Sequence, residues 1–286
     1  MQRPLAVILS LALAALACGP NLPNLNLPIS QITPGPLETL TISEPLPDAE
    51  VAQVTLNVGA GNLTLAGGAD GLVSGQVEYN VAEWKPEIKR DGAAVTIEQG
   101  SAKDQLNIPS GDLVNKWDIQ LGDMPLELTV NAGAYEGEAD LSGLSLRRLE
   151  FNDGASTNAV TFDAANPEEM TLLKYSTGAS TVTLTGLANA NFTEMIFEGG
   201  AGTDTLDFTG ALQRDARVTV RAGVCTLTIV VPPGTQTEIT KSGAVTSVKT
   251  EGTWNTSGDT YRLSGAGPLL RIDLDMGLGT LNLVSK

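Results

Sequence analysis

Apolar and polar residues alternate in short segments from Leu126 to the C-terminus, and a glycine interrupts each segment near its middle. When each such glycine is taken as position 0, positions −5, −3 and +6 are apolar and position +3 is polar. Alternation with a period of two predicts β-strands that bury one face. The glycines recur at spacings of 21, 24, 22 and 23 residues, and they are Gly133, Gly154, Gly178, Gly200 and Gly223.

A repeat of about 22 residues is typical of solenoids, in which each unit buries its apolar face against its neighbours. The segment LRIDLDMGLGTLNLV around Gly277 returns to the pattern. Between Gly223 and Gly277 the register is loose: KSGAV at 241–245 resembles another turn, and TWNTSGDTYRL indicates an irregular excursion. We predict a stacked β-solenoid over residues 125–286, similar to a single-stranded β-helix with one strand, turn and strand per coil.

Residues 49–124 are also β-rich but less repetitive. Segments such as VTLNVGAGNLTLAGG and AAVTIEQG alternate between glycine-rich or charged breaks,. No stretch of the mature chain has a convincing helical period over ten or more residues. The fold class predicted for the mature chain is therefore all-β, with a smaller β-rich N-terminal domain at 49–124 that precedes the solenoid.

The N-terminus has the features of an export signal. Arg3 precedes an apolar run, Leu5 to Ala17, that is too short to span a bilayer,. The run ends at a small-x-small cleavage pattern, and Cys18 stands where a bacterial lipoprotein signal places its acylated cysteine. We predict a signal peptide at 1–18, lipid attachment at Cys18 and a proline-rich extended linker at 19–48. Simple secretion without acylation is the alternative.

Composition limits the chemistry. The chain has 33 acidic and 17 basic residues, a net charge of −16, so its field repels nucleic acid,. Histidine is absent, which removes the commonest general base and zinc ligand,. Cys225 is the only cysteine besides Cys18, so a framework of several disulfides is excluded,. We expect no cofactor and no metal site.

One motif points the other way. GGAGTDTLD at 199–207 fits the calcium-binding β-roll template, but those rolls need the glycine–aspartate unit on successive coils,. Asp204 occupies position +4, where the flanking coils carry Val182 and Leu227. We therefore expect no calcium here. We expect Asp204 to face inward or lie at a corner and accept backbone N–H bonds.

Three other groups of residues are candidates for function, each with a structural alternative. Threonines at +3 and +5 predict a hydroxylated ladder, which can bind ice or a crystalline polymer but is also common on exposed strands. Glu136, Glu138 and Asp140 can support glycoside chemistry, or they can simply be solvated,. Trp84 and Trp117 can contact a ligand or partner, or they can cap the end of the core,.

The leader, the proline-rich spacer, the segments VTLNVGAGNLTLAGGAD and YNVAEWKPEI, and the glycine–alanine turns together resemble the bacterial toast-rack family of cell-surface proteins. They also resemble related adhesin-like β-solenoid domains, including those attached to envelope stress-response proteins. The resemblance implies a stacked β-fold at the cell envelope, and it supplies no catalytic motif. We therefore expect a non-enzymatic, lipid-anchored, adhesin-like binding or scaffolding protein at the outer face of the cytoplasmic membrane or the cell surface.

The expected partner is an envelope glycan or a membrane protein. Two alternatives remain open for the function. One is a carbohydrate-active β-helix enzyme that uses carboxylates such as Glu136 and Glu138. The other is an accessory protein that docks on a membrane stress-sensing partner.

Overall fold

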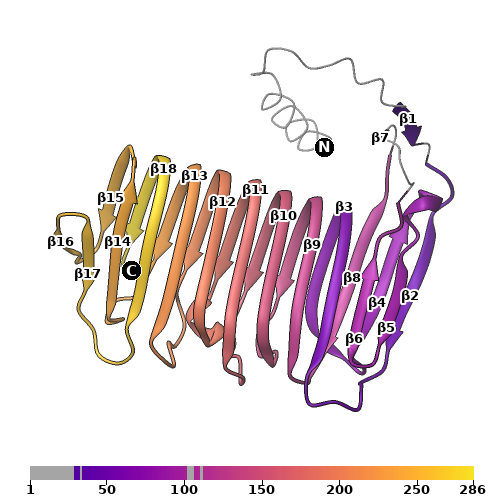
Figure 1. Cartoon of the computed structure of the whole chain (residues 1–286), viewed down its shortest axis with the longest axis horizontal. Coiled ribbons are helices and arrows are strands. Elements are labelled where there is room, and N and C mark those ends of the chain that lie inside the picture. The colour runs from indigo at the N-terminus through magenta and orange to yellow at the C-terminus, as the bar shows by residue number, and fades with distance from the viewer. Residues whose placement is uncertain (1–28, 33, 102–105, 110–111) are drawn as a thin grey trace.

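The computed structural model describes residues 29–32, 34–101, 106–109 and 112–286. Sixteen strands form one long sheet, and β1 (Ile29–Ile32) pairs with β7 (Leu106–Pro109) in a separate small sheet (Figure 1). The helical segments of the described residues are two short 3₁₀ turns, η1 (Ala82–Trp84) and η2 (Leu187–Ala190). The predicted all-β class is confirmed.

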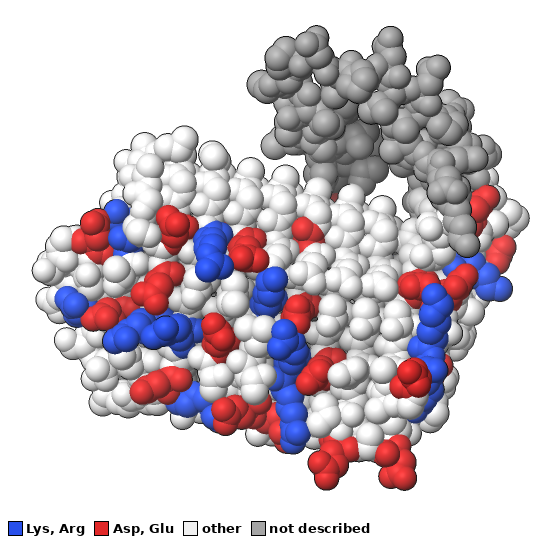
Figure 2. Space-filling model, viewed as in Figure 1, with Lys and Arg blue, Asp and Glu red and all other residues white. Residues whose placement is uncertain are grey.

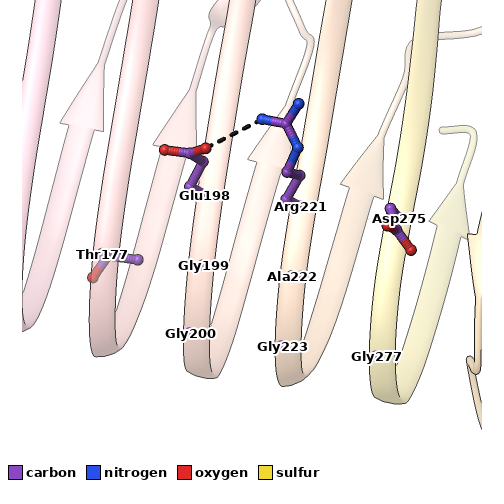
Figure 3. A pocket seen from close by; sticks show the side chains of 9 residues that line it. All are labelled: Thr177, Glu198, Gly199, Gly200, Arg221, Ala222, Gly223, Asp275 and Gly277. Atoms are coloured by element: carbon purple, nitrogen blue, oxygen red, sulfur yellow. Dashed lines mark hydrogen bonds and ion pairs between the residues drawn. The ribbon is translucent and has the colours of Figure 1, made fainter.

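Seven long strands form the stack, and each folds back on itself at its central glycine, as the close view of four of them shows (Figure 3). Neighbouring strands pair in parallel through both halves, so that Phe151 lies opposite Tyr175 before the bend and Val160 lies opposite Leu184 after it. The predicted stacked β-solenoid is thereby confirmed. In spatial order the strands are β3 (Ala52–Ala69), β9 (Leu126–Asp140), β10 (Leu146–Thr161), β11 (Met170–Thr185), β12 (Phe192–Asp207), β13 (Ala216–Val230) and β18 (Leu270–Val284).

The bends require glycine because the backbones stack closely there. A Cβ atom at Gly154 would lie 2.6 Å from the carbonyl oxygen of Gly133, and one at Gly277 would lie 2.6 Å from that of Gly223. Both distances are far below van der Waals contact, so a side chain would force the coils apart. The same contact recurs along the whole stack, through Gly59, Gly133, Gly154, Gly178, Gly200, Gly223 and Gly277.

The core fills the space between the two halves of each coil. The columns at −5, −3 and +6 are buried, as their alternation predicts,. Three aromatic rings from the −3 column stack in sequence: the Phe151 and Tyr175 centroids are 5.4 Å apart, and those of Tyr175 and Phe197 are 6.0 Å apart. These centroid distances lie in the favourable range for aromatic pairs.

The first coil, β3, comes from the N-terminal region. In the sheet, β3 lies directly beside β9. In the sequence, β9 begins 57 residues after β3 ends, because β4 to β8 are inserted between them. On the other side of β3, β6 (Ala94–Glu98) pairs with its first half and β8 (Asn115–Gly122) with its second half. Two antiparallel strands extend this end, β4 (Val73–Tyr79) beside β8 and β5 (Glu87–Asp91) beside β6. The sheet is continuous across residue 124, and the domain division predicted there stays a prediction.

At the other end, β18 lies between β13 and a terminal coil that precedes it in sequence. This coil consists of β14 (Thr237–Gly243) and β15 (Ser247–Glu251), which pair with the two halves of β18. KSGAV, expected to be a turn, spans the end of β14 and the start of the connection to β15. The excursion TWNTSGDTYRL forms a hairpin of β16 (Asn255–Ser257) and β17 (Thr260–Leu263) that pairs with β14.

Part of the predicted linker belongs to the sheet. Residues 38–44 form β2 (Glu38–Glu44), which pairs antiparallel with β4. The physical reason is the alternation within ETLTISE, which buries Ile42 at 1% exposure,. The predicted signal peptide and Cys18 lie outside the described residues. Within the described part of the chain, no helix has the length and apolarity to cross a membrane.

Candidate functional site

The outer surface of the coils has two faces of different chemistry. The face before each glycine bend, which we call the charged face, presents positions −6, −4 and −2. Figure 2 shows basic and acidic side chains interspersed over one face of the molecule. The charged residues of these columns are Glu127, Arg148, Glu150, Lys174, Glu194, Glu198, Arg217, Arg221, Arg271, Asp273 and Asp275.

Glu198 is the centre of an ion-pair group on the charged face. Its carboxylate lies 3.6 Å from Lys174 Nζ and 3.2 Å from Arg221 Nη1, and it accepts a hydrogen bond from Ser176 at 3.2 Å. Desolvation acts to raise the pKa of Glu198, but the Ser176 bond and the two cations outweigh it and lower the pKa below its usual value. The pairs are solvent-exposed, so each contributes at most about 1 kcal/mol.

A shallow hollow lies beside this group at the bends of β11, β12, β13 and β18 (Figure 3). Gly200, Gly223 and Gly277 form part of its lining, and they leave the hollow open because they carry no side chains. Glu198, Arg221 and Asp275 stand over it and can bond a polar ligand through charged donors and acceptors,.

A ladder of amides continues position −2 toward the N-terminal coils. Asn152 donates its side-chain amide to Asn131, and Asn131 donates to Asn57, both at 2.8 Å. Sequence reasoning missed this ladder. The signal is present in the sequence, since asparagine stands at −2 before Gly59, Gly133 and Gly154, but the sequence around Gly59 does not by itself identify β3 as a coil.

The face after each bend carries threonine. We define the threonine face as positions +3 and +5 of β10, β11, β12, β13 and β18. Its +3 column places one threonine directly opposite the next across all five strands. The column consists of Thr157, Thr181, Thr203, Thr226 and Thr280, and the +5 column consists of Ala159, Thr183, Thr205, Thr228 and Asn282.

The two predicted contact tryptophans differ in position. Trp117 is 1% exposed and donates its indole N–H to Asn115 at 2.9 Å. The expected ligand contact at Trp117 is thereby corrected, because a ring inside the core cannot stack on an external ligand while the sheet is intact. Trp84 is half-buried in η1, and a contact there stays a prediction.

The carboxylates of the predicted alternative site lie on the open face of β9. Glu136, Glu138 and Asp140 are all exposed, and Glu136 accepts a 3.4 Å hydrogen bond from Asn62. They project side by side from one strand, as their alternate spacing predicts.

A polar cluster is buried inside the bend. Tyr135 and Tyr175 both donate hydrogen bonds to Asp153, Ser156 donates to it at 3.0 Å, and Asn158 donates to Tyr175 at 2.7 Å. Desolvation raises the pKa of Asp153, although the bonds from Tyr175, Tyr135 and Ser156 oppose it. Desolvation and the nearby Asp153 carboxylate raise the pKa of Tyr175 as well. Desolvation likewise raises that of Tyr135.

Asp204 faces inward, as predicted, and is 2% exposed. Its Oδ1 accepts no hydrogen bond in the described structure. Desolvation raises the pKa of Asp204 to about 6, and a hydrogen bond with the Val182 backbone opposes this rise. Desolvation, with the Asp204 charge as the smaller cause, raises the pKa of buried Cys225 to about 11. Val182 and Leu227 flank Asp204 on the adjacent strands. Within the described ranges, no group of three or more histidine, cysteine or carboxylate residues is placed to hold a metal ion.

The fold and these faces define the class: a stack of bent parallel strands that presents extended polar surfaces. Residues 33–172 match the family model described as the N-terminal domain of toast_rack, DUF2154. The chain thus carries the toast-rack N-terminal domain over these residues, and the predicted resemblance is confirmed. No curated protein matches the chain.

Solved structures that align with most of this chain include two bacterial proteins. A candidate cell adhesion protein from Clostridium sporogenes is 23% identical, with 89% of this chain and 100% of that chain covered and a TM-score of 0.49. A candidate adhesin from Bacteroides fragilis is 13% identical, with 89% and 99% covered and a TM-score of 0.42.

Proposed function

We propose that this protein is an adhesin-like, non-enzymatic binding or scaffolding protein of the cell envelope. The observation that supports it most directly is the parallel pairing of seven stacked coils through both halves of each coil, which presents two extended polar faces. Solenoids use such repeated surfaces for binding.

The proposal includes attachment to the membrane by a lipid at Cys18. Its support is the sequence of residues 1–18, in which a short apolar run ends directly before that cysteine,. An anchored chain places the coils at the envelope surface, where an extended face can meet a glycan or a membrane protein. A single acyl chain binds a membrane only weakly, so stable anchoring at Cys18 requires a second acyl chain or another membrane contact.

Crosslinking in cells tests the function. The tagged full chain is crosslinked in the living bacterium, and the membrane-protein and wall-polysaccharide fractions are then analysed separately. We expect one specific envelope component to be recovered with the tag. Incubation of the purified protein with a set of polysaccharides tests the enzyme alternative, which release of reducing ends or unsaturated uronates, lost in a Glu136→Gln/Glu138→Gln variant, would support.

A further inference from the structure

The chemistry of the threonine face differs from that of every other outer face of the stack. Over the five strands β10 to β13 and β18, its +3 and +5 positions carry eight threonines, one alanine and one asparagine. None of these residues is charged, although the chain as a whole carries −16. Within the described structure, one hydrogen bond is made inside the face, from Asn282 Nδ2 to Thr228 Oγ1 at 3.2 Å.

Charged residues bound the threonine face at both ends. On the N-terminal side the same positions of β9 carry Glu136 and Glu138. On the C-terminal side Lys249 of β15 lies opposite Asn282 of β18. The next outward position, +7, carries Asp207 on β12, so the neutral area is a patch with charged residues at its edges.

Strand propensity alone does not account for this segregation. Threonine is favoured on exposed strand surfaces in general, so propensity would enrich both faces alike. The charged face belongs to the same strands, yet its −2 column reads Asn152, Ser176, Glu198, Arg221 and Asp275 over the same five coils. The threonine column also follows spatial order, since Thr280 lies opposite Thr226 although the two are 54 positions apart in the sequence.

The +3 and +5 columns form a regular lattice, because their residues lie opposite one another on successive strands. Adjacent strands lie about 4.8 Å apart and alternate residues along a strand about 6.7 Å apart, so five strands extend over about 19 Å. Each threonine offers a hydroxyl that both donates and accepts, beside a methyl group. A partner with hydroxyls and apolar C–H groups at regular intervals can make the same weak contact on several strands at once, and such contacts combine strongly.

We propose that the threonine face binds the surface of an ordered, uncharged polysaccharide. The absence of charge selects the partner, because a polyanion would gain nothing from this face and would be repelled by Glu136 and Glu138 at its border. This inference rests on the adhesin-like function proposed above and names the partner of one face.

Co-sedimentation of the purified full-length protein with microcrystalline cellulose and with crystalline chitin tests the proposal. We expect binding to at least one of these neutral polymers and little binding to polygalacturonate. A Thr181→Lys/Thr203→Lys variant places two long cations in the centre of the lattice, and its affinity should fall about tenfold or more. Because Thr181 and Thr203 are exposed, the thermal unfolding of the variant should match that of the wild type.

Thr219→Lys is the matched control, since Thr219 belongs to β13 but faces outward on the charged face, opposite Asp273. It should bind like the wild type. Thr203→Val keeps the shape and removes the hydroxyl, so a smaller loss is expected from it than from the lysines.

The proposal is overturned if the wild type binds neither polymer, or if the double lysine variant binds as well as the wild type. Ice is another ordered neutral surface; thermal hysteresis that the lysines abolish, without polymer binding, would also overturn it. If the protein is crosslinked to an envelope component in cells but binds neither polymer, this inference is wrong while the proposed adhesin-like function still holds.

Discussion

Tyr135 of β9 donates a hydrogen bond from its hydroxyl to Oδ1 of Asp153 on β10, at 2.9 Å. Tyr175 of β11 donates to the other carboxylate oxygen, so one buried carboxylate joins three successive coils. A buried polar group is costly when a partner is removed, about 1 to 3 kcal/mol. This cluster therefore favours one register of the stack over a slipped one, in which the carboxylate would lose its donors.

The first prediction concerns this cluster. Tyr175→Phe removes one donor to Asp153 and the acceptor of the Asn158 amide, and we expect it to lower the free energy of unfolding by about 1 to 3 kcal/mol in guanidinium titrations. Tyr261→Phe is the control, a buried tyrosine of the terminal hairpin outside the cluster. If both variants lower the free energy of unfolding equally, the cluster does not stabilise the stack more than an ordinary buried tyrosine does.

The second prediction concerns Asp204. Its folded pKa of about 6 is above its ordinary value of 3.8, so between these pH values the folded state binds more protons than the unfolded state. Stability from this group is therefore present below pH 4 and is lost as the pH rises through about 6. Asp204→Asn should stabilise the protein at pH 7 by on the order of 2 kcal/mol and flatten the decline between pH 4 and 6.

Asp207→Asn is the matched control for Asp204, on the same strand but facing outward. Asp153 also has a raised pKa, so part of the decline with pH should persist in the Asp204→Asn variant. Denaturation curves recorded at several pH values check this prediction. If the pH dependence of stability is the same in Asp204→Asn as in the wild type, the prediction is wrong, and the buried carboxylate is stabilised by an interacting group in solution.

The third prediction concerns the bends. Gly154→Ala brings a methyl group within 2.6 Å of the Gly133 carbonyl oxygen, and we expect a loss of about 2 kcal/mol or more,. Gly35→Ala is the control, because the nearest atom to its added Cβ is 3.5 Å away, an ordinary contact. Thermal unfolding of both variants makes the comparison. A Gly154→Ala protein as stable as Gly35→Ala would contradict the close stacking of the bends.

The fourth prediction concerns the anchor. Cys18→Ser should abolish incorporation of labelled palmitate and release the protein from the membrane fraction. Cys225→Ala leaves the leader intact, so this variant should still incorporate the label and remain in the membrane fraction. Retention of the label by Cys18→Ser would place the acyl chain elsewhere, and absence of the label from the wild type would show cleavage without acylation.

The period-two columns and the glycine spacing predicted the coils from β9 to β13 and β18, because each coil is a local segment with its own alternation. The spatial neighbours at the two ends could not be predicted in the same way. β3 pairs with β9 over an insertion of five strands, and β18 separates β13 from the earlier β14. Such pairings depend on long-range closure, which leaves no period in the sequence.

The sequence predicted the position of some candidate site residues correctly but not that of others. Asp204 was placed inward correctly because its position follows from strand alternation. Trp117 was expected as a possible contact because charged neighbours flank it, yet those neighbours point out from β8 while the indole points in. The neutral threonine face needed the spatial order of the coils, since its five-strand extent includes Thr280 of the last strand.

The central claim is that the outer faces of the coil stack bind an envelope component. The most direct measurement is photo-crosslinking in living cells with a photoreactive amino acid at position 203 on the threonine face, position 219 on the charged face or position 227 in the core. The account predicts a specific envelope adduct from at least one outer position and none from the core position. Adducts from neither face, with the protein intact at the envelope, would contradict it.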